Sequence, residues 1–169
     1  IAVSYYNTRE IIFIQNFNVI AGNIIGQFFG NSLLEEMIFR GILLIQLYLI
    51  FIAKYSNKMT IIYSLAASAV IFVLSHIPNR ILTYTPDNIV IDTMSLLFGS
   101  TLIGIIFLKT KNLPFVIGFH SLVNYPSNII VTNIPTEPII FALVIIITLK
   151  WDKIIGKETE YLLPTNHPK

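Results

Sequence analysis

The chain has 169 residues, of which 54% are hydrophobic and 12% charged, a formal net charge of +2 and a mean hydropathy of +0.74. Soluble domains carry about a quarter charged residues, so this composition excludes an ordinary water-soluble enzyme and indicates a membrane protein. The sequence contains no cysteine, which excludes a disulfide framework and a cysteine nucleophile.

Six apolar segments follow one another along the chain. About 20 helical residues cross a bilayer core of about 30 Å. Charged and proline residues separate segments near that length at 11–30, 33–54, 59–77, 89–108, 113–133 and 138–150, followed by a polar tail over 151–169. We therefore predict an all-α fold, a polytopic transmembrane helical bundle with about six spans.

No composition shift or internal repeat divides the chain, so we expect one membrane domain over residues 1–169. The first residue is Ile1 and not Met, which suggests that an N-terminal part is missing.

Basic residues predict the orientation of these spans, because Lys and Arg mark the cytoplasmic side of a membrane. Arg80 alone lies on one side, and Arg40 lies within a span. The other nine of the 11 Lys and Arg residues share the opposite side: Arg9, Lys54, Lys58, Lys109, Lys111, Lys150, Lys153, Lys157 and Lys169. We expect a multi-pass protein of the cell membrane, in a bacterial cytoplasmic membrane, with both termini cytoplasmic.

The second span carries three charged residues in "LLEEMIFRGILL", residues 33–44. A charge near the bilayer centre costs about 3 to more than 10 kcal/mol, so each needs a partner or a wet cavity. Glu36 and Arg40 share a helical face and are predicted to pair, whereas Glu35 points about 100° away. A buried ion pair explains Glu36 and Arg40 but not Glu35, which suits a general base.

Two histidines in other spans provide further polar groups. His76 follows Phe72 by four residues in the third span, and His120 precedes Asn124 by four residues in the fifth. Such a set fits attack of water on an amide, in which Glu35 removes a proton and hydrogen-bond donors stabilise the oxyanion. Spacing alone does not separate the roles of the two histidines.

A serine nucleophile beside either histidine is the alternative form of this chemistry. Ser75 directly precedes His76, and Ser121 directly follows His120. Because neighbours in a helix diverge by about 100°, we expect neither pair to meet and predict direct hydrolysis without an acyl-enzyme.

The three polar patterns together resemble a known family. "EEMIFR" begins at Glu35, "FVLSH" ends at His76, and "HSLVN" runs from His120 to Asn124. In this order they are similar to the CAAX protease and bacteriocin-processing (Abi) family, with a protease core over about residues 27–130.

The resemblance implies a metal-independent intramembrane endopeptidase of the glutamate type. It implies Glu35 as the catalytic base, His76 as a second group that activates the water, and His120 with Asn124 as the oxyanion site. No cofactor or metal is expected. The expected partners are the lipid bilayer and a peptide or prenylated-peptide substrate, without nucleic acid, and the oligomeric state stays open.

The resemblance also implies that Glu36 and Arg40 support the site. Counted from the ends of their spans, the four catalytic residues lie at different depths in the membrane. They converge only if a break at Gly30–Ser32 lies inside the membrane. We therefore expect the span limits near residues 31 and 77 to be wrong by several residues.

Three other functions compete with a metal-free protease. A zinc hydrolase would use Glu35, His76 and His120 as ligands, although no H-E-x-x-H helix is present. A proton-coupled transporter would use the same Glu and His as a relay, although no repeated halves are visible. A catalytically silent immunity or interaction protein would keep these residues for packing only.

Overall fold

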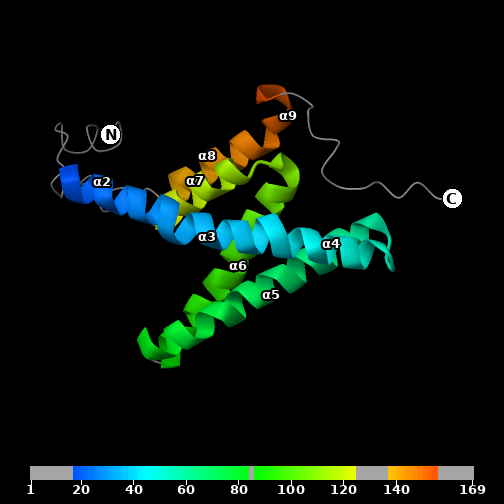
Figure 1. Cartoon of the computed structure of the whole chain (residues 1–169), viewed down its shortest axis with the longest axis horizontal. Helices are drawn as coiled ribbons and strands as arrows, with labels where there is room; N and C mark the ends of the chain where they lie inside the picture. The colour runs from blue at the N-terminus through cyan, green and yellow to red at the C-terminus, as the bar shows by residue number, and fades with distance from the viewer. Residues whose placement is uncertain (1–16, 84–85, 125–136, 156–169) are drawn as a thin grey trace. The chain divides into compact units, whose positions relative to one another are not determined.

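The computed structural model describes residues 17–83, 86–124 and 137–155, and these ranges contain helices and no strand (Figure 1). The predicted all-α fold is therefore confirmed. Within the described ranges, residues 17–35 and 114–155 belong to one compact unit, called the first unit below, and residues 36–113 to a second.

Helical backbone runs without interruption from residue 17 to residue 52. Its segments are α2 (Phe17–Ile25), the π-helix η1 (Gly26–Ser32), α3 (Leu33–Glu36), the π-helix η2 (Met37–Leu44) and α4 (Ile45–Ile52). The predicted break at Gly30–Ser32 is wrong, since η1 continues into α3 through Leu33 at φ −61° and ψ −51°. The break was predicted from the division of the chain into spans of about 20 residues, 11–30 and 33–54, but the structure joins these two segments in one continuous helical stretch.

The second unit contains α5 (Asn57–Thr83) and α6 (Pro86–Thr110) in addition to η2 and α4. Helix α5 packs against η2, α4 and α6. Helices α5 and α6 approach closely at Gly104, where a Cβ would lie 2.8 Å from Leu65 Cδ2, so a larger residue would require the Leu65 side chain to move. Near the other end of the pair, Arg80 Nε lies 2.9 Å from Asp92 Oδ2.

Helix α5 is longer than the predicted third span of residues 59–77. Pro78 lies inside the helix, which continues to Thr83. A proline removes one backbone donor but is tolerated in membrane helices, where nearby groups satisfy the released carbonyl. Helix α5 therefore ends at Thr83 and not near residue 77, and the helical stretch does not end near residue 31, whereas the positions of the span limits in a membrane stay a prediction.

The first unit combines α2 and η1 with residues 114–124 of α7 (Leu113–Asn124), α8 (Glu137–Leu149) and α9 (Trp151–Ile154). Aromatic contacts hold α7 against α8 and α9, with ring centroids 5.4 Å apart for Phe119 and Phe141 and 4.8 Å apart for Phe115 and Trp151. The predicted end of the fifth span at residue 133 lies outside the described residues.

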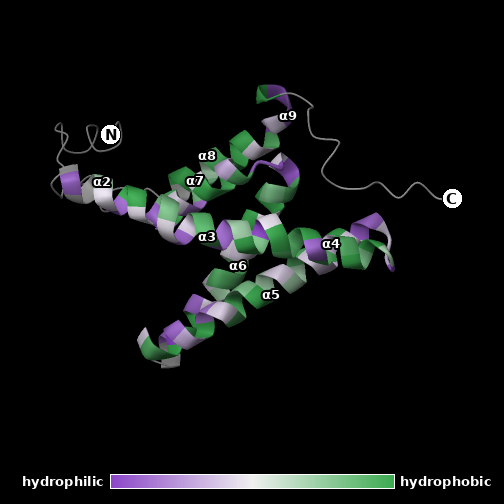
Figure 2. Cartoon of the chain, viewed as in Figure 1, coloured by the Kyte–Doolittle hydropathy of each residue, from purple (hydrophilic) through white to green (hydrophobic). Residues whose placement is uncertain are grey.

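The described residues include two helices long and apolar enough to cross a membrane, Asn57–Thr83 and Asn88–Thr110. Shorter apolar helices occupy Leu113–Asn124 and Ile139–Leu149. Figure 2 shows hydrophobic residues in green along α5, α6 and α8. Large apolar side chains such as Phe98 and Leu149 are exposed, as expected for surfaces that face lipid. The number of six spans stays a prediction.

Candidate active site

The two predicted catalytic residues Glu35 and His120 meet within the first unit. Glu35 lies in α3 and His120 in α7, and Glu35 Oε2 is 3.7 Å from His120 Nε2. The two atoms are farther apart than in a direct hydrogen bond, but they are close enough for one small polar group to contact both side chains. The Glu35 side chain is 27% exposed and that of His120 8%, so the pair is accessible mainly from the glutamate side.

Helix α3, which carries both glutamates, is a single four-residue turn between two π-helical segments. π-Helical segments are rare in proteins. Those that do occur are often found at functional sites, because the wider turn changes which side chains share a face.

The predicted pairing of Glu36 with Arg40 is confirmed. Arg40 Nη1 donates to Glu36 Oε1 over 3.0 Å, and the two side chains are 1% and 0% exposed. Arg40 Nη2 donates to both the backbone oxygen and the hydroxyl of Ser100 in α6, over 3.0 and 2.9 Å. These bonds disperse the guanidinium charge over three acceptors, as a charge buried away from water requires.

Ser100 was missed by the sequence analysis. Helix α6 also contains Ser95 and Thr101, and nothing in their spacing marks the one that faces Arg40. No sequence signal would have identified Ser100 before the packing of α6 against η2 was known.

Phe72 connects the buried ion pair to His76 within the second unit. The Arg40 guanidinium carbon lies 4.9 Å from the centre of the Phe72 ring. On the same helix, the Phe72 and His76 ring centroids are 4.3 Å apart at an interplanar angle of 33°. The cation and the imidazole therefore both depend on the position of one aromatic ring.

The backbone also fixes the tautomer of His76. His76 Nδ1 lies 2.8 Å from the Phe72 carbonyl oxygen. Because a carbonyl oxygen only accepts, Nδ1 must carry the hydrogen, and Nε2 of the neutral ring is then an acceptor. An imidazole in this tautomer can accept a hydrogen bond or a proton from water.

The expectation that Ser75 and His76 do not meet is wrong. Ser75 Oγ lies 3.2 Å from His76 Nδ1, because both atoms turn toward the Phe72 carbonyl, to which Ser75 Oγ donates over 2.7 Å. Since Nδ1 carries the hydrogen, it cannot take the serine proton, and this pair does not form a nucleophile and base. Ser121 Oγ likewise donates to a backbone oxygen, that of Ile117, over 2.9 Å.

Asn124 is the last residue of α7 and is exposed, one turn after His120 on the same helix. The structure thus brings together Glu35 with His120, Glu36 with Arg40, and His76 with Phe72. Convergence of all four predicted catalytic residues stays a prediction. In the described part of the first unit, no third His, Asp or Glu joins Glu35 and His120 as a metal ligand.

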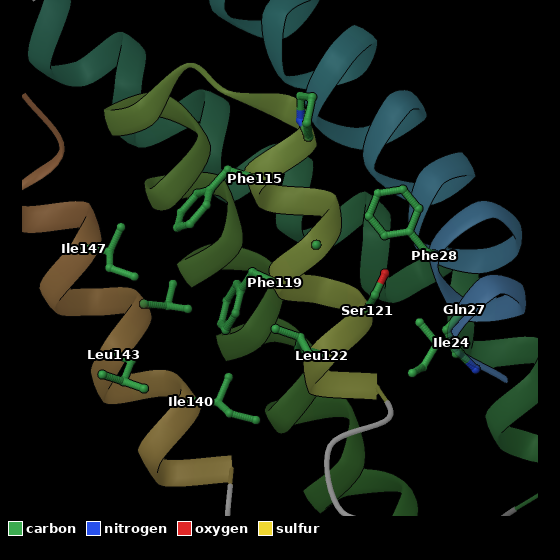
Figure 3. A pocket seen from close by; sticks show the side chains of 13 residues that line it. Ile24, Gln27, Phe28, Phe115, Phe119, Ser121, Leu122, Ile140, Leu143 and Ile147 are labelled. Atoms are coloured by element: carbon green, nitrogen blue, oxygen red, sulfur yellow. The ribbon is translucent and has the colours of Figure 1, made fainter. Parts of the chain in front are cut away.

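An apolar cavity of about 550 Å³ lies in the first unit (Figure 3). Phe119 and Ser121, which flank His120 in the sequence, both line it. The sequence analysis did not predict this cavity, because its walls come from segments far apart in the chain.

Comparison with protein-family models matches residues 17–126 to "Type II CAAX prenyl endopeptidase Rce1-like". The matched range includes all six residues that the sequence analysis assigned to the site. No curated protein and no solved structure matches the chain.

Proposed function

The chain belongs to the Rce1-like family of type II CAAX prenyl endopeptidases, and we propose that it cleaves a peptide bond with water activated by Glu35 and His76. The family is one of membrane-embedded proteases. We propose a multi-pass location in the cell membrane and, as substrate, a peptide with or without a prenyl group. A bacteriocin-type peptide in a bacterial membrane is the setting that we favour.

The proposed reaction is direct hydrolysis. A Glu35 carboxylate oxygen takes a proton from water, and the water oxygen attacks the carbonyl carbon of the substrate. Hydrogen bonds from His120 and Asn124 stabilise the oxyanion that forms. When the C–N bond breaks, the leaving nitrogen takes the proton from Glu35, so the enzyme returns to its starting state.

The observation that carries this proposal is the approach of Glu35 Oε2 to His120 Nε2 at 3.7 Å. It supports a base and an oxyanion donor that are close enough to contact the same substrate group. The tautomer of His76 supports its role as an acceptor for the water, because Nδ1 is held by the Phe72 carbonyl.

The buried ion pair supports the site without taking part in the chemistry. Glu36 and Arg40 are almost fully buried, and neither is accessible to a substrate. Arg40 fixes α6 through Ser100 and lies over Phe72, whose carbonyl orients His76. We propose that this network holds α3, α5 and α6 in the geometry that catalysis requires.

Cleavage by the purified chain in lipid nanodiscs tests the function. The probes are two libraries of internally quenched peptides, one with farnesylated cysteine and one without, and products are sequenced by mass spectrometry. We expect cleavage that disappears in Glu35→Gln and persists in Asp152→Asn, a matched acid-to-amide change at an exposed position of α9. In H₂¹⁸O, one ¹⁸O should enter the new carboxyl group, without a trapped acyl-enzyme.

Three results would overturn the proposal. Unchanged cleavage by Glu35→Gln would remove the base, and no cleavage of either library would favour the silent or transport functions. Loss of activity on chelation, restored by Zn²⁺, would replace the metal-free mechanism with the zinc alternative.

A further inference from the structure

A groove of about 520 Å³ lies in the second unit, formed by the end of α4, the turn that follows it and one face of α5. Its walls are apolar except for two tyrosine hydroxyls. The lining residues are Phe51, Tyr55, Tyr63, Ala66, Ala67, Val70 and Ile71. Those on α5 recur at three- and four-residue intervals, so they share one side of the helix.

Three aromatic rings form the end of the groove beside the α4–α5 turn. The ring centroids of Tyr55 and Tyr63 are 4.8 Å apart, and each lies 6.1 Å from that of Phe51. All three pairs have edge-to-face geometry, which favours aromatic contacts. The two tyrosines are 43% and 38% exposed. Exposed tyrosines of this kind are typical of the boundary between hydrocarbon and lipid headgroups.

The length of the groove matches one leaflet of a bilayer. Helix α5 is long and apolar enough to cross a membrane, and Val70 lies at its middle. From Tyr63 to Ile71 the wall extends over about 12 Å, at about 1.5 Å per residue. Half of a hydrocarbon core of about 30 Å is about 15 Å. The groove therefore leads from the turn to about the midplane of the span.

Lysines lie at the aromatic end of the groove. Lys54 directly precedes Tyr55 in the turn, and Lys58 is the second residue of α5, and both are exposed. Figure 2 shows the hydrophilic residues of this turn in purple. In the predicted orientation these lysines are cytoplasmic, on the side where the leaflet carries anionic lipids.

The end of α6 adds two further lysines at the same end of the second unit. Gly104 approaches Leu65, whereas Arg80 pairs with Asp92, so α6 runs antiparallel to α5. The last turn of α6 is therefore level with the first turn of α5. The lysines at that end of α6 are Lys109 and Lys111.

The acidic residues of the second unit lie elsewhere in its described part. Residues 37–83 and 93–113 contain no Asp or Glu. Glu36 is buried with Arg40, and Asp87 and Asp92 belong to the first two turns of α6, at the opposite end of the helix pair. An apolar groove thus opens at an end of the unit whose charges are positive, which is complementary to an anionic headgroup.

We propose that this groove binds one acyl chain of an anionic phospholipid, whose headgroup lies at the α4–α5 turn beside Lys54. A zwitterionic lipid fits the apolar walls equally well but lacks the net negative charge that lysines attract. A second copy of the chain is disfavoured, because a two-fold contact would set this patch against itself and its lysines against one another. The site uses none of the proposed catalytic residues and does not depend on the proposed reaction.

The first experiment tests the selection of the headgroup. The full chain in an uncharged detergent is titrated with phosphatidylglycerol or with phosphatidylcholine of identical acyl chains, and bound lipid is counted by native mass spectrometry. Phosphatidylglycerol should bind more tightly, by about fivefold for each lysine that acts on it. Lys54→Gln should lower this preference about fivefold, and Lys54→Gln with Lys58→Gln should lower it further. Lys153→Gln, an exposed lysine of the first unit, is the matched control and should leave it unchanged.

The second experiment tests the groove itself. Ala67→Phe should fill the groove and weaken the binding of both lipids by about tenfold, the effect of about two buried methylene groups. Ala66→Met, at an exposed position of the same wall, is a milder change that should give a smaller loss even where Ala67→Phe does not fold. Ala142→Phe, at an exposed position of α8 outside the groove, is the matched control and should have no effect.

The third experiment locates the bound lipid. Phosphatidylglycerol with a diazirine in one acyl chain is photo-crosslinked to the unmodified chain, and the attached residues are mapped by mass spectrometry. Crosslinks should fall on Phe51, Tyr63 and Val70, and should decrease with unlabelled phosphatidylglycerol. Soluble glycerol phosphate at the same concentration should not compete, because it lacks the acyl chain.

Several outcomes would overturn the inference. Equal binding of the two lipids, or an unchanged preference in the double lysine variant, would show that the lysines do not select the headgroup. Unchanged binding in both Ala67→Phe and Ala66→Met, or crosslinks spread evenly over α5 and α6, would place the lipid outside the groove. Competition by glycerol phosphate would assign the site to a free phosphate compound, and loss of a dimer in Ala67→Phe would assign it to a second copy.

Discussion

The adjacent acids Glu35 and Glu36 should respond differently to the same substitution. Glu36 is fully buried and bonded to Arg40, whereas the Glu35 side chain is 27% exposed and lies 3.7 Å from His120, beyond hydrogen-bond distance. We expect Glu36→Gln to destabilise the fold, and Glu35→Gln to leave the fold intact while it abolishes turnover.

The burial of the pair sets the expected magnitude. Removing one partner of a buried ion pair costs about 3–5 kcal/mol of unfolding free energy, because the other charge is left uncompensated. Gln keeps an oxygen that can accept from Arg40 Nη1, so Glu36→Gln should fall near the lower end of that range. For the partly exposed Glu35, the expected cost is about 0–1 kcal/mol, as for exposed pairs.

Denaturant unfolding in mixed micelles, followed by circular dichroism, measures both costs, and cleavage of the quenched peptides measures turnover. A double variant, Glu36→Gln with Arg40→Met, should recover part of the loss because no buried charge remains. Equal stability of the two single variants would refute the division of roles between the acids. So would full activity of Glu35→Gln.

Further outcomes concern α5, α6 and α7. Ser100→Ala should cost about 1.5–3 kcal/mol, as expected for a hydrogen bond to a charged group. Ser95→Ala on the same helix should stay within about 0.5 kcal/mol, because Ser95 is exposed and donates to the Ile91 carbonyl, and equal costs would remove Ser100 from the network. Asn124→Ala should lower kcat by about 10² to 10³ with little change in KM, and chelators should leave the unmodified enzyme active; a loss under fivefold would argue against an oxyanion donor. Arg80→Ala and Asp92→Ala should each cost less than about 1 kcal/mol, because their pair is partly exposed; a larger cost would show that the pair secures α5 to α6.

The helical class and two side-chain pairs one helical turn apart follow from the sequence alone. Composition required apolar helices, and the helical period placed Glu36 beside Arg40 and Phe72 beside His76, both confirmed by contacts four residues apart. The order of the three polar patterns identified the family, which the match over residues 17–126 confirms. Local geometry is sufficient for such inferences because residues one helical turn apart meet whatever the tertiary packing.

The ends and continuity of the helices were less predictable. Gly30 and Pro78 both suggested an end, but η1 continues into α3 and α5 continues to Thr83. Their low propensity costs about 1 and 3 kcal/mol relative to alanine. Packing against neighbouring helices outweighs penalties of this size, and the sequence does not report that packing.

Which distant side chains meet depends on the tertiary structure. The 3.7 Å approach of Glu35 to His120 joins α3 to α7, and the bonds from Arg40 to Ser100 join η2 to α6. Such contacts depend on the rotation and depth of whole helices against one another, and a shift of one residue turns a side chain by about 100° to another face. The cavity of the first unit has the same origin, because three separate helical segments each supply part of its wall.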